Sequence, residues 1–214
     1  MFQPAFILVR PQMGENIGAA ARAMWNFGLD HMRIVAPRDG WPNQSAVAMA
    51  SGAGRLLDEA QLYKDVTSAI GDRTHVYATT ARPRELTKTV LTPEAAMADA
   101  SARIRAGAQI GILFGPERAG LENDDIAPAN TIISVPVNPS FPSLNLAQCA
   151  LILGYEWRKL VSDTEQFSVA ESSEDQAKIA DIEHLVSHYE ERLDEAGFFF
   201  PAAKAQSRKT NFRN

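Results

Sequence analysis

The fold of this chain is decided by IGILFGPERAGLENDDI, residues 110–126, and ISVPVNPSFPSLNLAQCALILGYEW, residues 133–157. Each stretch joins an apolar run, typical of a buried strand, to a loop of Gly, Pro, Asn, Ser and charged residues. The second stretch then continues into an apolar helix. Two such loops so close together in the sequence can form a compact pocket for a small polar ligand.

Strand and helix signals alternate along the rest of the chain. Apolar runs predict strands at residues 5–9, 32–35, 75–78, 110–114 and 132–135. Helical patterns fall between them, at residues 16–27, 44–49, 65–70, 93–105 and 145–160. We expect Asn16 to cap the first of these helices. The alternation predicts an α/β fold, with a parallel sheet flanked by helices, over residues 1–161.

The composition changes after this region. Residues 162–177 are polar and acidic and are typical of a linker. Residues 179–196 carry an apolar stripe at helical spacing, which predicts an amphipathic helix. The C-terminal segment, residues 178–214, is therefore expected to hold one helix and a basic tail that contains Lys204, Arg208, Lys209 and Arg213.

Composition limits the classes of function. The formal net charge of −5 argues against a uniformly basic nucleic-acid binder but permits a local basic face. Cys149 is the only cysteine, so the chain cannot form an internal disulfide, which fits a reducing compartment. No apolar run approaches the roughly 20 residues of a membrane span. We therefore expect a soluble cytoplasmic protein without a membrane partner.

Three polar loops follow predicted strands, at residues 79–84, 115–120 and 138–145. In parallel α/β sheets, ligands bind outside the carboxyl ends of the strands. Ordinary turn chemistry is the simpler explanation for any one of these loops. Three of them at the same edge favour a ligand site. Ser143 and Asn145 can cap the helix that follows the third loop.

Single residues leave alternatives open. Arg22 lies among alanines and is either a functional guanidinium or a surface arginine. For Glu117 and Arg118, an ion pair that shapes the loop is favoured over paired acid and base catalysis. Cys149 lies on an apolar helix face, which favours a core position.

The histidines give no metal-ligand spacing with the acidic residues or with the cysteine. His184 and His188 are four residues apart and could form one edge of a metal site, but a polar helix face is the better explanation. Neither a phosphate-binding P-loop nor a strand–GxGxxG–helix pattern is present. We therefore predict no metal.

Three motifs carry a resemblance to a known family. NIGAAARA, LFGPERAGL and NPSFPSLNLAQ, at residues 16–23, 113–121 and 138–148, resemble the ordered motifs of the SpoU/TrmH branch of the SPOUT superfamily of RNA 2′-O-methyltransferases. The match in order and spacing covers residues 5–160. LDEAGFFFP, at residues 193–201, resembles the C-terminal extension of the TrmJ type. That type methylates the 2′-hydroxyl of a pyrimidine nucleotide in the tRNA anticodon loop.

The resemblance implies a C-terminal trefoil knot in the α/β domain, a homodimer, and S-adenosyl-L-methionine as the cofactor. The implied cofactor-binding residues are Thr79, Thr80, Ala81, Gly115, Val135, Pro142, Ser143 and Leu144. The implied catalytic residues are Arg22, Asn16, Ser143 and Asn145, with Glu117 as a loop scaffold. Pro142 stands where relatives often have a small hydroxyl residue, so only a backbone contact is expected there.

Arg22 is the implied catalytic residue whose chemistry is least usual. A guanidinium with a pKa above about 12 is a poor general base. It is a good phosphate clamp and a good stabiliser of a developing alkoxide. We expect Arg22 to act in that second way.

The predicted function is methylation of a ribose 2′-hydroxyl in tRNA, at a pyrimidine at position 32 of the anticodon loop. The alternatives are a ribosomal RNA 2′-O-methyltransferase and an RNA-binding module that holds the cofactor without turnover. DNA is excluded as a substrate because it lacks the hydroxyl that is modified. Candidate RNA contacts are Arg10, Arg33, Arg38, Arg82, Arg84 and the basic tail. For any single one of them, a solvated surface position is the favoured explanation.

Overall fold

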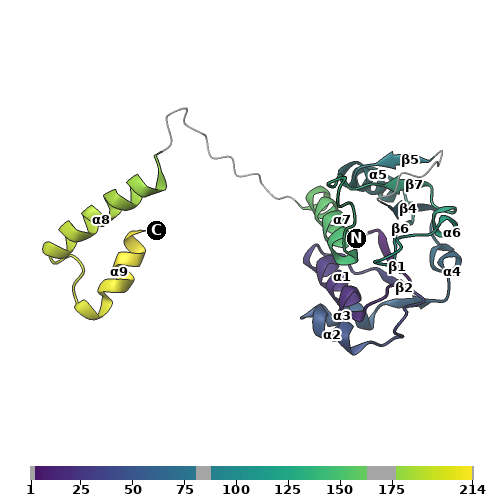
Figure 1. The fold of residues 1–214 in the computed structure, drawn as a ribbon, viewed down its shortest axis with the longest axis horizontal. Helices are drawn as coiled ribbons and strands as arrows, with labels where there is room; N and C mark the ends of the chain where they lie inside the picture. Colours follow the sequence, from purple (N-terminus) through teal and green to yellow (C-terminus); the bar gives the residue numbers. More distant parts are fainter. Residues whose placement is uncertain (1–2, 81–87, 163–176, 214) are drawn as a thin grey trace. The chain divides into compact units, whose positions relative to one another are not determined.

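The structure is a computed structural model that describes residues 3–80, 88–162 and 177–213. The chain divides into two compact units, Met1–Thr164 and Glu165–Asn214. Figure 1 draws both units. Nearly all of the expected linker, residues 162–177, lies outside the described residues.

The first unit is built on one parallel sheet. In the described residues its strands follow the order β3-β2-β1-β6-β4-β7-β5, and every pairing between neighbours is parallel. Their bounds are β1 Ala5–Val9, β2 Met32–Val35, β3 Gln61–Tyr63, β4 His75–Thr79, β5 Thr89–Leu91, β6 Ile110–Phe114 and β7 Thr131–Ile133. The predicted α/β class with a parallel sheet is confirmed, and the trefoil knot stays a prediction.

Helices cover both faces of the sheet (Figure 1). They are α1 Gly14–Asn26, α2 Gln44–Ala50, α3 Gly54–Asp58, α4 Val66–Ile70, α5 Pro93–Arg105, α6 Asn123–Ile126 and α7 Leu146–Val161. One buried apolar cluster joins the sheet to α1, α2, α3, α5 and α7. A second cluster joins the opposite face to α4 and α6. The sheet is therefore the middle layer of three.

The alternation of side chains along β1 explains why its sequence is apolar throughout. Phe6 and Leu8 belong to the cluster under α1 and α7. Ala5, Ile7 and Val9 belong to the cluster under α4 and α6. Because successive side chains of a strand point to opposite faces and both faces are covered, all five positions must be apolar.

The small residues of NIGAAARA bring α1 and α2 close together. A Cβ at Gly18 would lie 2.1 Å from the carbonyl oxygen of Ala46, and a Cβ at Gly14, two residues before the motif, would lie 2.0 Å from Asn43 Oδ1. Ala20 and Ala21 are fully buried. Helix packing therefore accounts for most of this motif, and leaves Asn16 and Arg22 as its polar members.

Two wrongly predicted boundaries change the position of a site residue. Helix α1 begins at Gly14 with Met13 in the cap position, so Asn16 lies inside its first turn and does not cap it. Strand β7 ends at Ile133, so Val135 lies in the following loop. The cap predicted for Asn145 is confirmed, because its Oδ1 accepts a hydrogen bond from the Ala147 amide at 2.8 Å.

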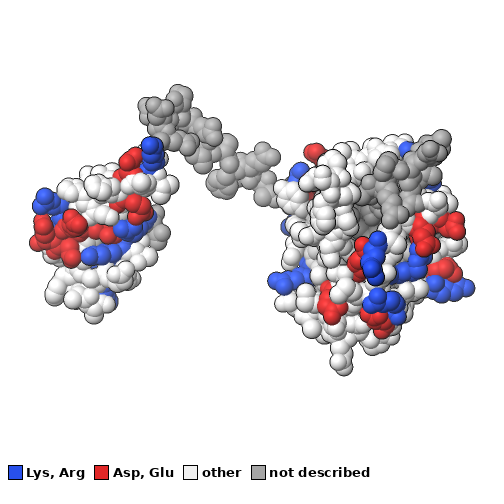
Figure 2. All heavy atoms as spheres, viewed as in Figure 1, with Lys and Arg blue, Asp and Glu red and all other residues white. Residues whose placement is uncertain are grey.

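The second unit holds α8, Ile179–Glu195, a short 3₁₀ turn, Ala202–Lys204, and α9, Ala205–Phe212. The basic tail is helical, which the sequence did not predict. Arg213 forms ion pairs with Glu183 and Glu190 of α8, each at 2.7 Å. Lys209 pairs with Asp194 at 3.1 Å. Acidic and basic side chains are accordingly mixed on the face of this unit seen in Figure 2.

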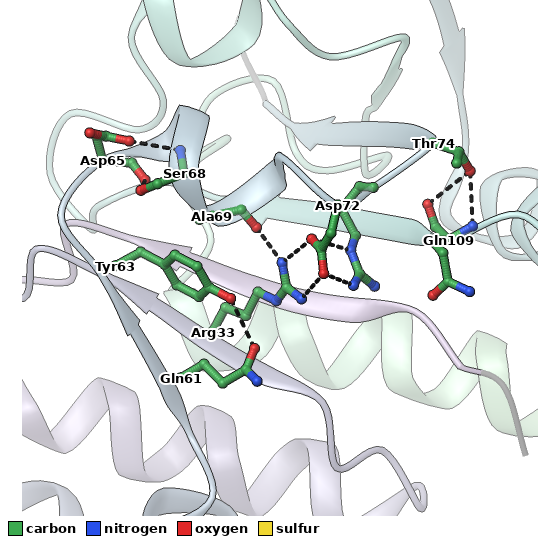
Figure 3. A network of polar contacts seen from close by, with 10 residues as sticks. Arg33, Gln61, Tyr63, Asp65, Ser68, Ala69, Asp72, Thr74 and Gln109 are labelled. Carbon is green, nitrogen blue, oxygen red and sulfur yellow. Dashed lines mark hydrogen bonds and ion pairs between the residues drawn. The ribbon is translucent and has the colours of Figure 1, made fainter.

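Arg33 lies on the face of the sheet that α4 covers and is only 6% exposed. Its guanidinium donates two hydrogen bonds to Asp72, at 2.6 and 2.7 Å, and one to the Ala69 carbonyl at 2.6 Å (Figure 3). Arg73 donates to the same carboxylate. These two cations hold the pKa of Asp72 well below its usual value. Arg33 is therefore a structural residue, and its prediction as an RNA contact was wrong.

Among the described residues, no helix combines the length and the apolar character that crossing a membrane requires.

Candidate active site

A cavity of about 320 Å³ lies at the carboxyl ends of β4, β6 and β7, which are neighbours in the sheet. Small-molecule sites in proteins start at about this size. The residues that line it are Thr79, Thr80, Phe114, Gly115, Pro116, Glu117, Arg118, Ala119, Gly120, Ile133, Val135, Val137, Pro142, Ser143, Leu144, Leu146 and Cys149.

All the predicted cofactor-binding residues that the structure describes line this one cavity. They are Thr79, Thr80, Gly115, Val135, Pro142, Ser143 and Leu144. Ala81 lies outside the described residues. The three loops chosen from the sequence therefore meet at one edge of the sheet, as the rule for parallel strands predicts.

The walls of the cavity are mostly apolar, with a few hydroxyl groups. Phe114, Ile133 and Leu146 come from the buried core under α1 and α7. The hydroxyls belong to Thr79, Thr80 and Ser143. The Thr79 hydroxyl donates to the Leu113 carbonyl at 2.9 Å, so its side chain is fixed at the end of β4.

Gly115 lets the second loop close on itself. A Cβ there would lie 2.3 Å from the Leu121 amide nitrogen and 2.5 Å from the Gly120 carbonyl carbon. Both are backbone atoms that cannot move without moving the loop. Only glycine allows this wall of the cavity to take its observed shape.

A chain of hydrogen bonds connects three separate parts of the sequence beside the cavity. Glu117 accepts from the Gln12 amide at 2.9 Å and from Asn16 Nδ2 at 2.6 Å. Asn16 Oδ1 accepts from Asn145 Nδ2 at 2.9 Å. We call this the Asn145–Asn16–Glu117 chain. It corrects the ion pair expected between Glu117 and Arg118, because the carboxylate bonds to amides instead.

Arg22 stands apart from this arrangement. Its side chain is exposed on α1 and does not line the cavity. Ser143 is exposed on the cavity wall, two residues before Asn145. The fold thus brings together Asn16, Asn145, Glu117 and Ser143, and leaves Arg22 outside the cavity of its own chain.

Comparison with known proteins agrees with this geometry. Residues 3–155, most of the first unit, match the model of the SpoU rRNA Methylase family. The chain belongs to the SpoU methylase family. This SpoU methylase is also 32% identical over 203 residues to the tRNA (cytidine/uridine-2′-O-)-methyltransferase TrmJ of Yersinia pestis (strain Pestoides F). That alignment covers 94% of the chain and 78% of the relative.

Two more comparisons extend over both units. The tRNA (cytidine-2′-O-)-methyltransferase TrmJ of Methanocaldococcus jannaschii is 32% identical over 193 residues, which are 88% of this chain and 80% of the relative. The crystal structure of TrmJ from Z. mobilis ZM4 is 51% identical. It covers 99% of this chain and 88% of that chain, with a TM-score of 0.69.

The sequence of this SpoU methylase did not reveal that Cys149 lines the cavity. Burial raises the pKa of its thiol to about 11, with a hydrogen bond to Thr79 acting in the opposite direction. The thiol is therefore neutral at physiological pH. Cys149 packs against the core, as expected, and it also lines the cavity.

The cations proposed as RNA contacts differ in their surroundings. Arg10 donates to Asp125 at 2.9 and 2.5 Å, and Asp125 is 5% exposed, so this pair fixes α6 beside the end of β1. Arg38 pairs with its exposed neighbour Asp39 at 2.7 Å. Arg82 and Arg84 lie outside the described residues.

The part of the chain that the structure describes contains no group of three or more His, Cys, Asp and Glu side chains that could hold a metal ion.

Proposed function

We propose that this SpoU methylase transfers a methyl group from S-adenosyl-L-methionine to a ribose 2′-hydroxyl of tRNA, at pyrimidine 32 of the anticodon loop. The observation that carries the proposal is the cavity bordered by the Asn145–Asn16–Glu117 chain, in a protein whose relatives are named tRNA 2′-O-methyltransferases. A tRNA substrate would place this activity in the cytoplasm.

The cavity suits the cofactor in size and chemistry. Apolar walls from Phe114, Ile133 and Val135 can hold a flat base, and the hydroxyls of Thr79 and Ser143 can meet ribose or amino-acid groups. When bound, the cofactor supplies an electrophilic methyl group. The protein must align the ribose oxygen with that methyl, and alignment alone can supply roughly 7–11 kcal/mol in favourable cases.

Asn145 and Ser143 are placed to orient the ribose. Asn145 is fixed at both ends of its side chain, by the Ala147 amide and by Asn16. Ser143 precedes it on the cavity wall, where its hydroxyl is exposed to a ligand. Glu117 then acts as the scaffold that fixes Asn16.

Arg22 is proposed to stabilise the alkoxide that develops on the ribose as its proton leaves. Since Arg22 lies outside the cavity of its own chain, this role requires a second copy or the RNA itself to bring the two together. Arg22→Ala and Arg22→Lys should both lose activity while cofactor binding survives. Turnover near the wild-type rate in Arg22→Ala would contradict the assignment.

A homodimer is supported by an exposed apolar area on two helices that pack against each other. Trp25 of α1 is 44% exposed, and Leu151 and Tyr155 of α7 are 43% and 52% exposed. The Tyr155 ring also meets Phe27, which follows α1, edge to face. Equilibrium ultracentrifugation should give a dimer for the wild type and a weaker one for Tyr155→Glu.

Ribosomal RNA is the second candidate substrate, because the description of the matched family names it. The deciding experiment incubates the protein with cofactor and unmodified tRNA or ribosomal RNA transcripts, followed by mass spectrometry of the nucleosides. We expect a 2′-O-methylated pyrimidine from tRNA and none when the target ribose is 2′-deoxy. Absence of methylated product from tRNA would overturn the proposal.

A further inference from the structure

We infer that Phe141 and Arg118 form a nucleotide-binding rim at the mouth of the cavity. The phenyl ring would stack on a base of the bound RNA, and the guanidinium would bind a phosphate beside the ribose that is methylated. This inference rests on the proposed function and assigns the side chains that hold the substrate.

Phe141 is exposed to an extent that packing does not explain. Its relative exposure is 74%, and no other large apolar side chain described in the first unit is as exposed. Burying such a side chain would stabilise the fold, and this position forgoes that gain. An aromatic ring left in water beside a ligand cavity is suited to stacking.

The turn that carries Phe141 is rigid. The Phe141 amide donates to the Asn138 carbonyl at 2.9 Å, and the Ser140 amide donates to Asn138 Oδ1 at 3.0 Å. Pro139 and Pro142 restrict the backbone on either side. Residues at both ends of the turn, Val137 and Pro142, line the cavity. The ring is therefore held at the cavity edge at little further cost in backbone entropy.

Arg118 places a positive charge on the cavity wall, opposite in sign to the phosphates of RNA. Its side chain is exposed, and among the described residues none forms an ion pair with it. The neighbouring carboxylate of Glu117 is already bonded to Gln12 and Asn16. The guanidinium of Arg118 thus remains available for an anion from outside the chain.

The chemistry of the reaction requires a phosphate near that position. The 2′-hydroxyl shares its ribose with the 3′-phosphate, so any RNA that places the hydroxyl in the cavity also brings a phosphate to its mouth. Aromatic stacking combined with cationic contacts to the backbone is how proteins usually hold unpaired nucleotides. Arg118 and Phe141 provide one element of each kind.

The test compares Phe141→Ala, Phe141→Trp and Arg118→Gln with the wild type on an unmodified full-length tRNA transcript. Leu62→Ala removes an exposed apolar side chain from the edge strand β3, and Arg105→Gln removes an exposed charge at the end of α5, so they serve as matched controls. The measurements are kcat/KM, cofactor affinity by calorimetry, the salt dependence of tRNA binding, and oligomeric state by ultracentrifugation.

We expect Phe141→Ala to lower kcat/KM roughly 5- to 150-fold, the usual range for one stacked base, and Phe141→Trp to retain activity. Arg118→Gln should reduce the slope of log K against log salt by about 0.7, as for one phosphate on a single strand. Cofactor affinity should be unchanged in both, and the two controls should match the wild type.

Wild-type kinetics in Phe141→Ala would overturn the stacking role, and so would a change in oligomeric state, which would assign the ring to a protein contact. Weaker cofactor binding in Arg118→Gln with an unchanged salt slope would overturn the phosphate role. If the wild type methylates no tRNA, the proposed function fails, and the salt slope of tRNA binding still decides whether the rim exists.

Discussion

Replacing Glu117 by glutamine tests whether the Asn145–Asn16–Glu117 chain needs a carboxylate. Both ends of the chain are backbone amides that can only donate, Gln12 at one end and Ala147 at the other. Asn16 and Asn145 each accept one bond and donate one. One member must therefore accept twice without donating, and only an ionised carboxylate does so.

An amide at this position leaves one donor facing another donor, whichever way the amides are turned. Flipping Asn16 or Asn145 moves the mismatch along the chain without removing it. A buried donor without a partner costs about 1–3 kcal/mol, and the half-buried position of Glu117 and the exposed position of Asn145, where water can meet a displaced donor, favour the lower part of that range. We expect Glu117→Gln to lower the free energy of unfolding by about 1–2 kcal/mol. If the mismatch is relieved by moving Asn145, kcat should fall about 5- to 30-fold.

Urea unfolding and single-turnover methylation measure these two effects, with Glu59→Gln as the control. Glu59 pairs with Arg55 one helical turn away on the surface, a contact worth about 0.3–0.5 kcal/mol. A Glu117→Gln variant as stable and as active as Glu59→Gln would show that the chain does not need a carboxylate. If Glu117→Gln loses stability but keeps full activity, the Asn145–Asn16–Glu117 chain has a structural role only.

Three further perturbations have defined outcomes. Asp72→Asn leaves the guanidinium of Arg33, whose side chain is 8% exposed, without its anion. Urea unfolding should show that the free energy of unfolding falls by about 1–3 kcal/mol. This is below the value for a fully buried pair because the Asp72 side chain is 57% exposed. Burial lowers the pKa of His75. Below the ordinary pKa of histidine, the unfolded chain therefore takes up a proton that the folded chain does not, and the free energy of unfolding should fall as the pH drops from about 7 to about 5. A difference in stability between the wild type and His75→Gln that does not change with pH would contradict this. Gly115→Ala forces a Cβ against the Leu121 amide; calorimetry should show loss of cofactor binding, and unchanged affinity would show that the loop adapts.

The strands that the sequence predicted correctly are those buried on both faces. Residues 5–9, 32–35 and 110–114 match β1, β2 and β6 residue for residue. A short, largely apolar run of this kind is typical of a strand that is buried on both faces. Strands β3 and β5 were not predicted. Each has three residues at an edge of the sheet, and Leu62 and Val90 are 50% and 59% exposed. Neither segment has the length or the pattern that separates a strand from a loop.

The site was predictable as a set of loops but not as a set of contacts. The rule that ligands bind outside the carboxyl ends of parallel strands located the loops after β4, β6 and β7 without any knowledge of strand order. The partner of Glu117 was not predictable, because Gln12 lies 105 residues away and contributes only a backbone amide. The six-residue separation of Arg22 from Asn16 already places the two on different sides of α1. Which of those sides faces the cavity depends on how α1 packs, and that was not predictable from the sequence.

The hydrogen bonds of the Asn145–Asn16–Glu117 chain join residues that are made at different times during protein synthesis. Gln12 and Asn16 leave the ribosome first, Glu117 follows about a hundred residues later, and Asn145 comes last of the four. A nascent chain that has completed β7 has its sheet strands but lacks Asn145 and the start of α7. The pocket is therefore unfinished until almost the whole first unit has been made, because its lining residues extend to Cys149.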